Sequence, residues 1–220
     1  MDLATTHAAA QTLIDAAAYP PTHQYDVATL TPRGVLAERE QILLRLCPTF
    51  YRARRFLDLG ASKGFFSLKA AQKVDWVLAV EPAADALFAW AGVRPPNVRA
   101  WQGTFARLGL PASLEERFDL IWIGNAIHYT HREDPFGWVR RLAAWAADRV
   151  LIEGPVGPEC PDCQNWPVGA SGFVDWPEGS VPVEQEWLAE AESLGLMLVD
   201  RAPSVSYTPG RAVWFLQRKG

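Results

Sequence analysis

A glycine-rich turn with an acid on each side is the part of this sequence that can do chemistry. Residues 56–67 read FLDLGASKGFFS, and Asp58 ends an apolar run two residues before Gly60. Gly60 and Gly64 lack a Cβ, so the backbone there can approach a ligand closely. Glu81 ends the next apolar run, where a carboxylate can accept hydrogen bonds from both hydroxyls of a ribose. This spacing predicts a nucleotide-binding site.

Two kinds of ligand suit such a turn, a dinucleotide and S-adenosylmethionine. The helix that opens after the turn offers N–H donors to ligand oxygens in either case. Phe65 stands where a dinucleotide turn normally has its third glycine, which allows tight helix–strand packing. Asp58 can serve the cationic amino group of methionine, whereas it would repel a pyrophosphate. These details favour S-adenosylmethionine and leave a nicotinamide-dependent oxidoreductase as the alternative.

The same segments resemble the class I S-adenosylmethionine-dependent methyltransferases. The matching pieces are LDLGASKGFFSL, AVEP and FDLIWIGNAIHY, in the order and spacing of that family. The resemblance covers residues 54–153, and residues 184–216 fit the family's last helix and hairpin. Ser62 stands where many members have a second glycine, and the family tolerates this substitution.

The resemblance implies a cofactor site assembled from four segments. The turn holds the methionine portion, and Asp58 contacts it directly or through water. Glu81 binds the ribose, and the adenine lies near Pro82. Many members hold the adenine amino group with an aspartate after the third strand; this chain has QGTF there, and we expect Thr104 or Phe105 to contact the adenine instead. The backbone around Asn125, after the fourth strand, lines the site. The residues assigned to the cofactor are Asp58, Gly60, Ala61, Ser62, Gly64, Phe65, Glu81, Pro82, Thr104, Phe105 and Asn125.

Two histidines after the fourth strand are candidates for proton transfer. Methyl transfer mainly requires that the acceptor lie about 3 Å from the methyl group with water excluded. A base is needed only where the acceptor proton does not leave by itself, and an imidazole with a pKa near 6.5 can take that proton at neutral pH. We therefore expect His128, Tyr129 and His131 to be catalytic. A helix cap or a rim position is the alternative for either histidine.

Residues in two irregular segments are candidates to contact the acceptor. His23 and Tyr25 follow the first expected helix, and we expect them to fold over the site as a lid. Residues 154–182 are rich in proline and glycine and show no period; a loop of this length is usually functional or disordered. Within it, Trp166 and Trp176 offer apolar faces to a sugar, a ring or a lipid-like tail. We expect a small-molecule or glycan acceptor, methylated at oxygen.

Short apolar strands that alternate with helices position these residues. Strands are expected at 56–59, 76–80, 98–101, 118–123, 149–153, 196–200 and 212–216, and helices at 3–18, 33–46, 63–73, 83–91, 135–147 and 184–194. The alternation predicts an α/β fold with a Rossmann-like, seven-stranded, mostly parallel sheet and helices on both faces. We divide the chain into an N-terminal helical extension and lid (1–53) and a methyltransferase domain (54–220) with a loop insertion at 154–182.

Composition narrows the class of protein further. The 220 residues are 49% apolar and 21% charged, which excludes wholesale disorder, and a net charge of −4 gives no sign of a nucleic-acid partner. No apolar run approaches the roughly 18 residues of a membrane span, and no secretory signal is visible. Three cysteines make no disulfide framework, so we expect a cytoplasmic protein. Cys160 and Cys163 are only half of a zinc ribbon, and we expect no metal. A catalytically silent binding module on this fold is a further alternative.

Overall fold

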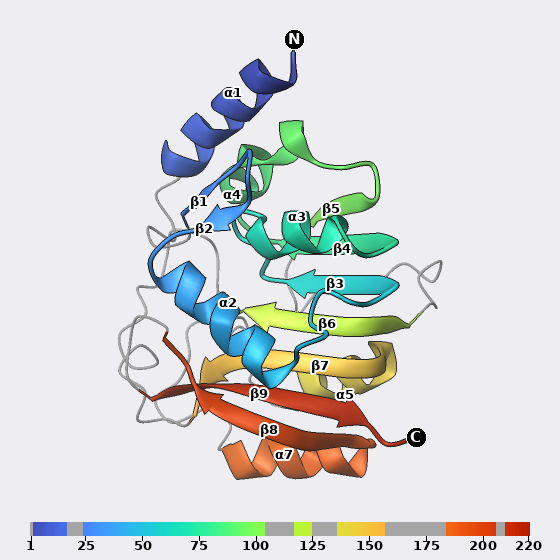
Figure 1. The fold of residues 1–220 in the computed structure, drawn as a ribbon. Coiled ribbons are helices and arrows are strands. Elements are labelled where there is room, and N and C mark those ends of the chain that lie inside the picture. The colour runs from blue at the N-terminus through green and yellow to red at the C-terminus, as the bar shows by residue number, and fades with distance from the viewer. Residues whose placement is uncertain (1, 17–23, 104–116, 125–135, 157–183, 206–209) are drawn as a thin grey trace.

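Seven strands form the central sheet of the computed structural model, which describes residues 2–16, 24–103, 117–124, 136–156, 184–205 and 210–220 (Figure 1). They are β3 (Arg55–Leu59), β4 (Trp76–Glu81), β5 (Val98–Gln102), β6 (Phe118–Gly124), β7 (Ala146–Pro155), β8 (Leu196–Pro203) and β9 (Arg211–Arg218). The order across the sheet is β5-β4-β3-β6-β7-β9-β8. The first five strands in this order pair in parallel, and β9 is antiparallel to both β7 and β8. The predicted Rossmann-like, mostly parallel sheet is confirmed.

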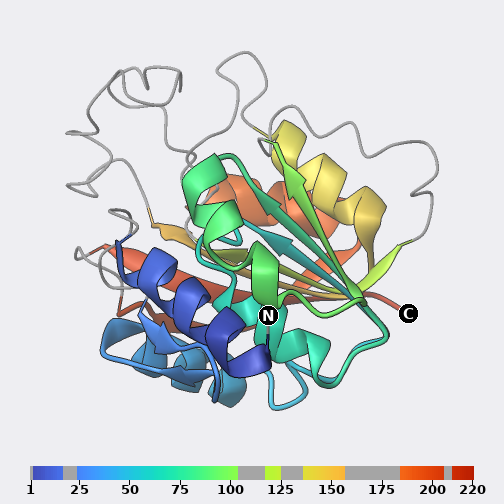
Figure 2. The same cartoon turned by 90° about the horizontal axis from the view of Figure 1, so that it is seen from above.

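Helices cover both faces of this sheet (Figure 2). The helices that the structure describes are α1 (Leu3–Ala16), α2 (Val35–Leu46), α3 (Phe65–Ala71), α4 (Ala84–Ala89), the 3-10 helix η1 (Ala91–Val93), α5 (Gly137–Trp145) and α7 (Glu184–Ser193), and α1 packs on α4 and η1. A separate two-stranded antiparallel sheet, β1 (Tyr25–Asp26) and β2 (Thr31–Pro32), connects α1 to α2, where the sequence predicts no strand. Each helix among the described residues is too short or too polar to cross a bilayer.

The sheet divides the apolar interior into two clusters. One lies under α1 to α4 and takes Phe56 and Trp122 from the strands, and the other lies under α5 and α7 and takes Leu57 and Ile121. Successive strand residues point to opposite faces, so a strand covered on both sides is a continuous apolar run. The same alternation puts Asp58 on the face of Phe56, under α2 and α3.

α2 packs across the front of the sheet and contacts β8 and β9 (Figure 1). Leu36 and Leu43 are buried and form one stripe of this helix, because residues three, four and seven positions apart share a face. Arg39 and Glu40 lie on that stripe too and are also buried. Two charged residues therefore occupy core positions of this helix.

Two predicted boundaries around β7 are wrong. The helix expected over 135–147 ends at Trp145, and Ala146 already pairs with β6. The loop expected from residue 154 begins later, because Gly154 still pairs with Ala212 of β9. Ladder hydrogen bonds from two neighbouring strands override the helix propensity of the alanines and the turn preference of the glycine.

Candidate functional site

The chain changes direction across the sheet between β3 and β6. From β3 it continues to β4 and β5 on one side, and from β6 it continues to β7 on the other. Loops that leave the carboxyl ends of two such strands part from each other, and a crevice opens between them. Gly60 follows β3 and Gly124 ends β6 at this switch point. The pocket there is lined by Leu36, Arg39, Gly60, Ala61, Ser62, Lys63, Phe65, Phe66, Trp122 and Gly124.

The turn after β3 is held by hydrogen bonds within the protein. The amides of Gly60 and Ala61 both donate to the carbonyl oxygen of Val80, at 2.9 and 3.0 Å. The amide of Ser62 donates to Glu81 Oε2 at 2.7 Å. These donors are engaged, so the turn is a poorer cradle for phosphate oxygens than its glycine spacing suggests.

Packing as well as glycine fixes the shape of the turn. Gly60 and Gly64 each have a φ of +81°, and Ser62 has a φ of +50°, in the left-handed region that favours glycine. A Cβ added to Gly64 would lie 2.5 Å from the ring of Trp90. The indole Nε1 of Trp90 also donates to the carbonyl oxygen of Ser62 at 3.2 Å. Trp90 therefore supports the turn, a role for which the sequence gives no local signal.

Asp58 is a buried carboxylate with one oxygen in use. Its side chain lies under α3, where Ser67 Oγ donates to Asp58 Oδ2 at 2.5 Å. Asp58 Oδ1 is buried and has no hydrogen-bond partner among the residues that the structure describes. Burial raises the pKa of Asp58 to about 7, because removal from water disfavours the charged form. A positively charged donor from a ligand would satisfy this oxygen.

Glu81 presents a fixed carboxylate at the end of β4. Its Oε2 accepts the amide of Ser62 at 2.7 Å, and its Oε1 accepts the amide of Ala83 at 3.0 Å. Burial raises the pKa of Glu81, and the two amides oppose that shift. Each carboxylate oxygen has two lone pairs, so each can also accept one hydroxyl of a ribose. Pro82 comes directly after Glu81.

Tyr25 does not face the acceptor as predicted. Its side chain is fully buried, and its hydroxyl donates to the carbonyl oxygen of Lys63 at 2.6 Å. The ring of Tyr25 packs against the ring of Phe65, with centroids 5.3 Å apart. The prediction for Tyr25 is corrected: it supports the glycine turn from β1 and offers no surface to a substrate.

A buried ion pair borders the pocket, and the sequence does not single out either partner. Arg39 Nε lies 2.7 Å from Glu153 Oε2, and the side chains are 1% and 0% exposed. Ser204, just after β8, donates its hydroxyl to Glu153 Oε1. Glu153 lies beside Gly124 in the register of β7 and β6. The sequence signal that could have identified the pair is Arg39 itself, a charged residue on the buried stripe of α2, three positions after Leu36.

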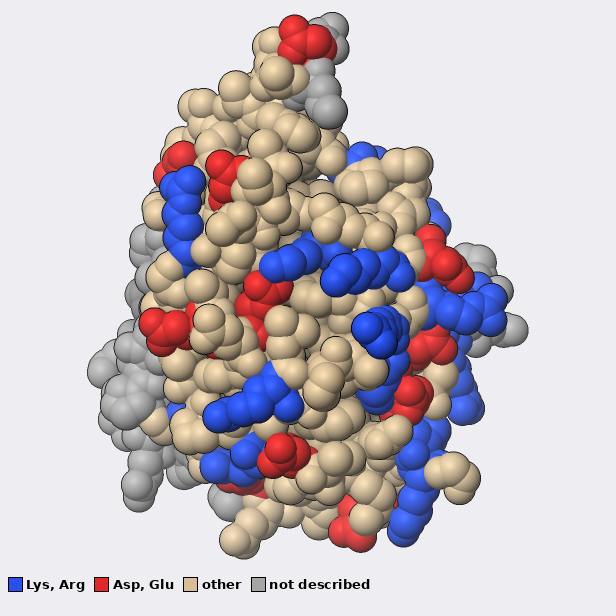
Figure 3. Space-filling view, in the orientation of Figure 1, with Lys and Arg blue, Asp and Glu red and all other residues tan. Residues whose placement is uncertain are grey.

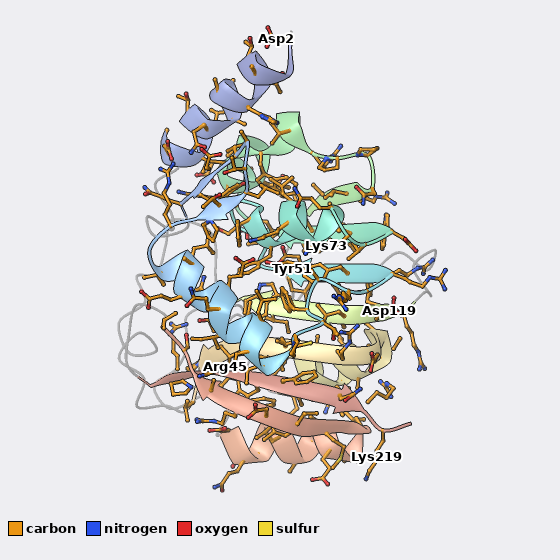
Figure 4. All side chains as sticks on the ribbon, viewed as in Figure 1. Asp2, Arg45, Tyr51, Lys73, Asp119 and Lys219 are labelled. Atoms are coloured by element: carbon orange, nitrogen blue, oxygen red, sulfur yellow. The ribbon has the colours of Figure 1, made fainter. Side chains whose placement is uncertain are left out.

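Charged and aromatic side chains tie α2 to α3. Lys69 Nζ lies 2.7 Å from each carboxylate oxygen of Glu40, and Tyr51 donates its hydroxyl to Glu40 Oε1 at 2.6 Å. Lys69 Nζ and Lys73 Nζ both lie 5.9 Å from the centroid of the Tyr51 ring. Tyr51 and Lys73 are labelled in Figure 4. On this face, basic and acidic side chains are interspersed (Figure 3). These contacts hold α2 in place as a wall of the pocket.

The described structure brings one part of the predicted site together. The residues at the ends of β3 and β4 are Asp58, Gly60, Ala61, Ser62, Gly64, Phe65, Glu81 and Pro82. The other predicted residues lie outside the described residues: His23, Thr104, Phe105, Asn125, His128, Tyr129, His131, Trp166 and Trp176. Cys160 and Cys163 lie outside them as well. Within the described ranges, no group of three His, Cys, Asp or Glu side chains can hold a metal ion.

Comparison with known proteins identifies the fold. The sequence matches no family model and no curated protein. Among solved structures, N-methyltransferase NodS from Bradyrhizobium japonicum WM9, in complex with S-adenosyl-L-homocysteine, matches with a TM-score of 0.64. The two are 14% identical, over 98% of this chain and 99% of NodS.

Two further structures have the same architecture. An S-adenosylmethionine dependent methyltransferase from Mesorhizobium loti matches with a TM-score of 0.60 at 15% identity, over 84% of this chain and 100% of that one. The 1,6-didemethyltoxoflavin-N1-methyltransferase of Burkholderia thailandensis matches with a TM-score of 0.58 at 19% identity, over 83% and 77%. This chain therefore has the Rossmann-like fold of the class I S-adenosylmethionine-dependent methyltransferases.

Proposed function

We propose that this chain is an S-adenosylmethionine-dependent methyltransferase that acts at oxygen on a small-molecule or glycan acceptor. The observation that supports the proposal is that two acids, Asp58 and Glu81, lie on either side of the glycine turn. Asp58 has a buried oxygen suited to an ammonium group, and Glu81 has a carboxylate suited to a ribose diol. An adenosyl ligand with an amino-acid tail has both an ammonium group and a ribose diol. The amides of Gly60 and Ala61 already donate to the carbonyl oxygen of Val80, which argues against a pyrophosphate bound at this turn.

The residues that surround the pocket have little covalent chemistry to perform. S-adenosylmethionine, when bound, supplies a methyl group that is already activated on a sulfonium. The chain has to hold the acceptor in line with that group and exclude water. Leu36, Phe65 and Phe66 give the pocket apolar walls that serve this purpose.

We assign proton transfer to the segment after β6, because Gly124 at the end of β6 lines the pocket. His128 is the proposed base for an acceptor hydroxyl, and Tyr129 and His131 are the other catalytic candidates in this segment. His23, Trp166 and Trp176 are the proposed acceptor contacts. NodS and the toxoflavin enzyme are N-methyltransferases by name. An acceptor screen must therefore include amines as well as hydroxyl compounds, and transfer to nitrogen alone would replace oxygen in the proposal.

The first test is thermal unfolding of the protein with S-adenosylmethionine, S-adenosylhomocysteine or NADH. A ligand at 100 times its dissociation constant stabilises a fold by roughly 2.7 kcal/mol, enough to raise the unfolding midpoint by a few degrees. We expect that rise with the two adenosyl ligands and none with NADH. A rise with NADH alone would favour the oxidoreductase, and no rise with any of the three would favour the silent binding module.

Binding of S-adenosylhomocysteine is expected to strengthen as pH rises toward 7. The carboxyl of Asp58 is mostly protonated below its pKa of about 7, and only the carboxylate attracts the ligand's ammonium group. The ionised fraction grows roughly 10- to 20-fold between pH 5.5 and 7, and the affinity should grow with it. In the ligand-free protein, folding stability depends on pH with the opposite sign. Because the fold raises the pKa of Asp58 from 3.8 to about 7, the protonated carboxyl contributes its full stability below pH 3.8. That stability is lost as the pH rises through about 7.

Isothermal calorimetry at several pH values measures this dependence. Asp58→Asn should bind more weakly and lose the pH dependence. 5′-Methylthioadenosine, which lacks the amino-acid tail, is the matched ligand and should bind with an affinity that does not follow the titration of Asp58. The same slope for both ligands would show that another group is responsible.

A further inference from the structure

The carbonyl oxygens of the glycine turn are held from outside the pocket, by side chains that the proposed function does not use. Trp90 Nε1 donates to the carbonyl oxygen of Ser62 at 3.2 Å, and the Tyr25 hydroxyl donates to that of Lys63 at 2.6 Å. Gln11 of α1 in turn bonds the backbone of Tyr25. We propose that Gln11 and Tyr25 are positioning residues that couple α1 to the shape of the turn, and so to the affinity for S-adenosylmethionine. This inference rests on the proposed function.

The turn needs this support because part of its backbone is strained. Ser62 has a φ of +50°, in the left-handed region that a residue with a Cβ disfavours, and Gly64 has a φ of +81°. Such a conformation persists only where the surrounding contacts over-determine it. Lys63 lies between these two residues, so a donor on its carbonyl oxygen fixes the orientation of the peptide that joins Lys63 to Gly64.

Tyr25 is a rigid donor for that peptide. Its side chain is fully buried, and its ring packs against the ring of Phe65, with centroids 5.3 Å apart. Burial raises the pKa of Tyr25, so its hydroxyl stays protonated and keeps the hydrogen that it donates to Lys63. The position of the hydroxyl therefore depends on where β1 holds the backbone of Tyr25.

Gln11 sets the position of β1 from α1. Its Nε2 donates to the carbonyl oxygen of Tyr25 at 3.1 Å, and its Oε1 accepts the amide of Val27 at 2.8 Å. The second hydrogen of Nε2 is used as well, because Nε2 also donates to Asp15 Oδ1 at 3.0 Å. A side-chain amide with both its donors and its oxygen engaged has one orientation, so Gln11 fixes β1 relative to α1.

α1 is itself anchored, and it supports both donors that hold the turn. Ala10 and Ile14, on either side of Gln11 in the helix, are buried in the same apolar cluster as Tyr25 and Trp90. α1 also packs on α4 and η1, and Trp90 lies between these two helices in the chain. The described residues that line the pocket all come after α1 in the sequence. The influence of α1 on the turn therefore passes through Tyr25 and Trp90 rather than through the ligand.

The first experiment is calorimetry on Tyr25→Phe, which keeps the ring and removes the donor. The affinity for S-adenosylhomocysteine should fall roughly 3- to 10-fold, the effect of one hydrogen bond. The affinity for 5′-methylthioadenosine, which lacks the tail that we assign to the turn, should stay the same. Equal losses for both ligands, or no loss for either, would overturn the role of Tyr25. Failure of the unmodified protein to bind either ligand would overturn the proposed function itself.

The second experiment combines Gln11→Ala with Tyr25→Phe. Gln11→Ala alone should also lower the affinity for S-adenosylhomocysteine, although Gln11 does not touch the turn. If Gln11 acts through the Tyr25 hydroxyl, the double variant should bind as Tyr25→Phe does, because no further contact with the turn is left to lose. Losses that multiply would show that the two residues act independently and would overturn the coupling. An unchanged affinity in Gln11→Ala would overturn it as well.

Thr12→Ala is the matched control on α1. Thr12 follows Gln11 in the helix and is exposed, and its hydroxyl donates to the carbonyl oxygen of Ala8 in the same helix at 3.0 Å. The substitution removes a polar side chain without touching β1 or the turn. Both ligands should bind this variant as they bind the unmodified protein. A loss of S-adenosylhomocysteine affinity here would show that any change in α1 has the effect, and it would overturn the specific role of Gln11.

Discussion

Gly64→Ala is expected to destabilise the fold by roughly 2–5 kcal/mol, the sum of left-handed strain and an overpacked contact. The φ of Gly64 is +81°, and a Cβ there would lie 2.5 Å from the ring of Trp90. Trp90 cannot easily move away, because it is fully buried and its indole donates to the carbonyl oxygen of Ser62. Urea unfolding at equilibrium measures the loss.

Gly195→Ala is the matched control. Gly195 has the same φ of +81°, but its added Cβ would come no closer than 3.8 Å to a neighbour, the flexible end of Arg218. The variant therefore carries the backbone strain without the clash and should cost only about 1–2 kcal/mol. The difference between the two variants isolates the contact with Trp90. Equal losses would mean that Trp90 yields to the new methyl group and does not fix the turn.

Glu81→Ala is expected to weaken S-adenosylhomocysteine binding by roughly 100- to 1000-fold, about 3–4 kcal/mol. The substitution removes the proposed acceptor of both ribose hydroxyls. It also removes the acceptor of the Ser62 and Ala83 amides, at 2.7 and 3.0 Å. Since Ser62 is in a left-handed conformation that its side chain disfavours, the turn loses a constraint at the point where it needs one. Calorimetry measures the affinity, and circular dichroism checks the fold.

Two variants separate the causes of that loss. Glu81→Gln keeps one carbonyl oxygen for an amide of the turn but removes the charge, and it should bind more weakly than the unmodified protein and more tightly than Glu81→Ala. Glu186→Ala removes an exposed carboxylate from α7, whose packing is on the opposite face of the sheet, and should change nothing. An unchanged affinity in Glu81→Ala would count decisively against an adenosyl site.

The sheet could be predicted from the sequence because its strands are buried on both faces. Residues 118–123 are apolar at every position except Asp119, and residues 149–153 have Val150, Leu151 and Ile152 at their centre, a pattern that can be seen without any knowledge of the partner strands. The boundaries around Ala146 and Gly154 could not be predicted in this way. They depend on ladder partners in β6 and β9 that are distant in the sequence, and tertiary pairing overrides local propensity there.

In the candidate site, too, some residues could be predicted from local sequence and others are brought together only by packing. The glycine turn and Glu81 could be predicted because their spacing along the chain is itself the signal. The ion pair of Arg39 and Glu153 joins residues more than a hundred positions apart, and only the packing of α2 on the sheet brings them together. Tyr25 was misassigned for a related reason: an aromatic residue in an irregular segment gives no sign of whether it packs inward or faces a ligand.

The place of β9 between β7 and β8 has a consequence for how the chain folds. β8 (Leu196–Pro203) comes before β9 in the sequence but has no ladder with β7, so it can join the sheet only through β9. Until residues 211–218 pair, the edge of β7 stays open and β8 has no partner, with Leu198 and Val199 among its apolar residues. A chain cut before Arg211 thus loses two strands rather than one, and it leaves unpaired edges of the kind that promote aggregation.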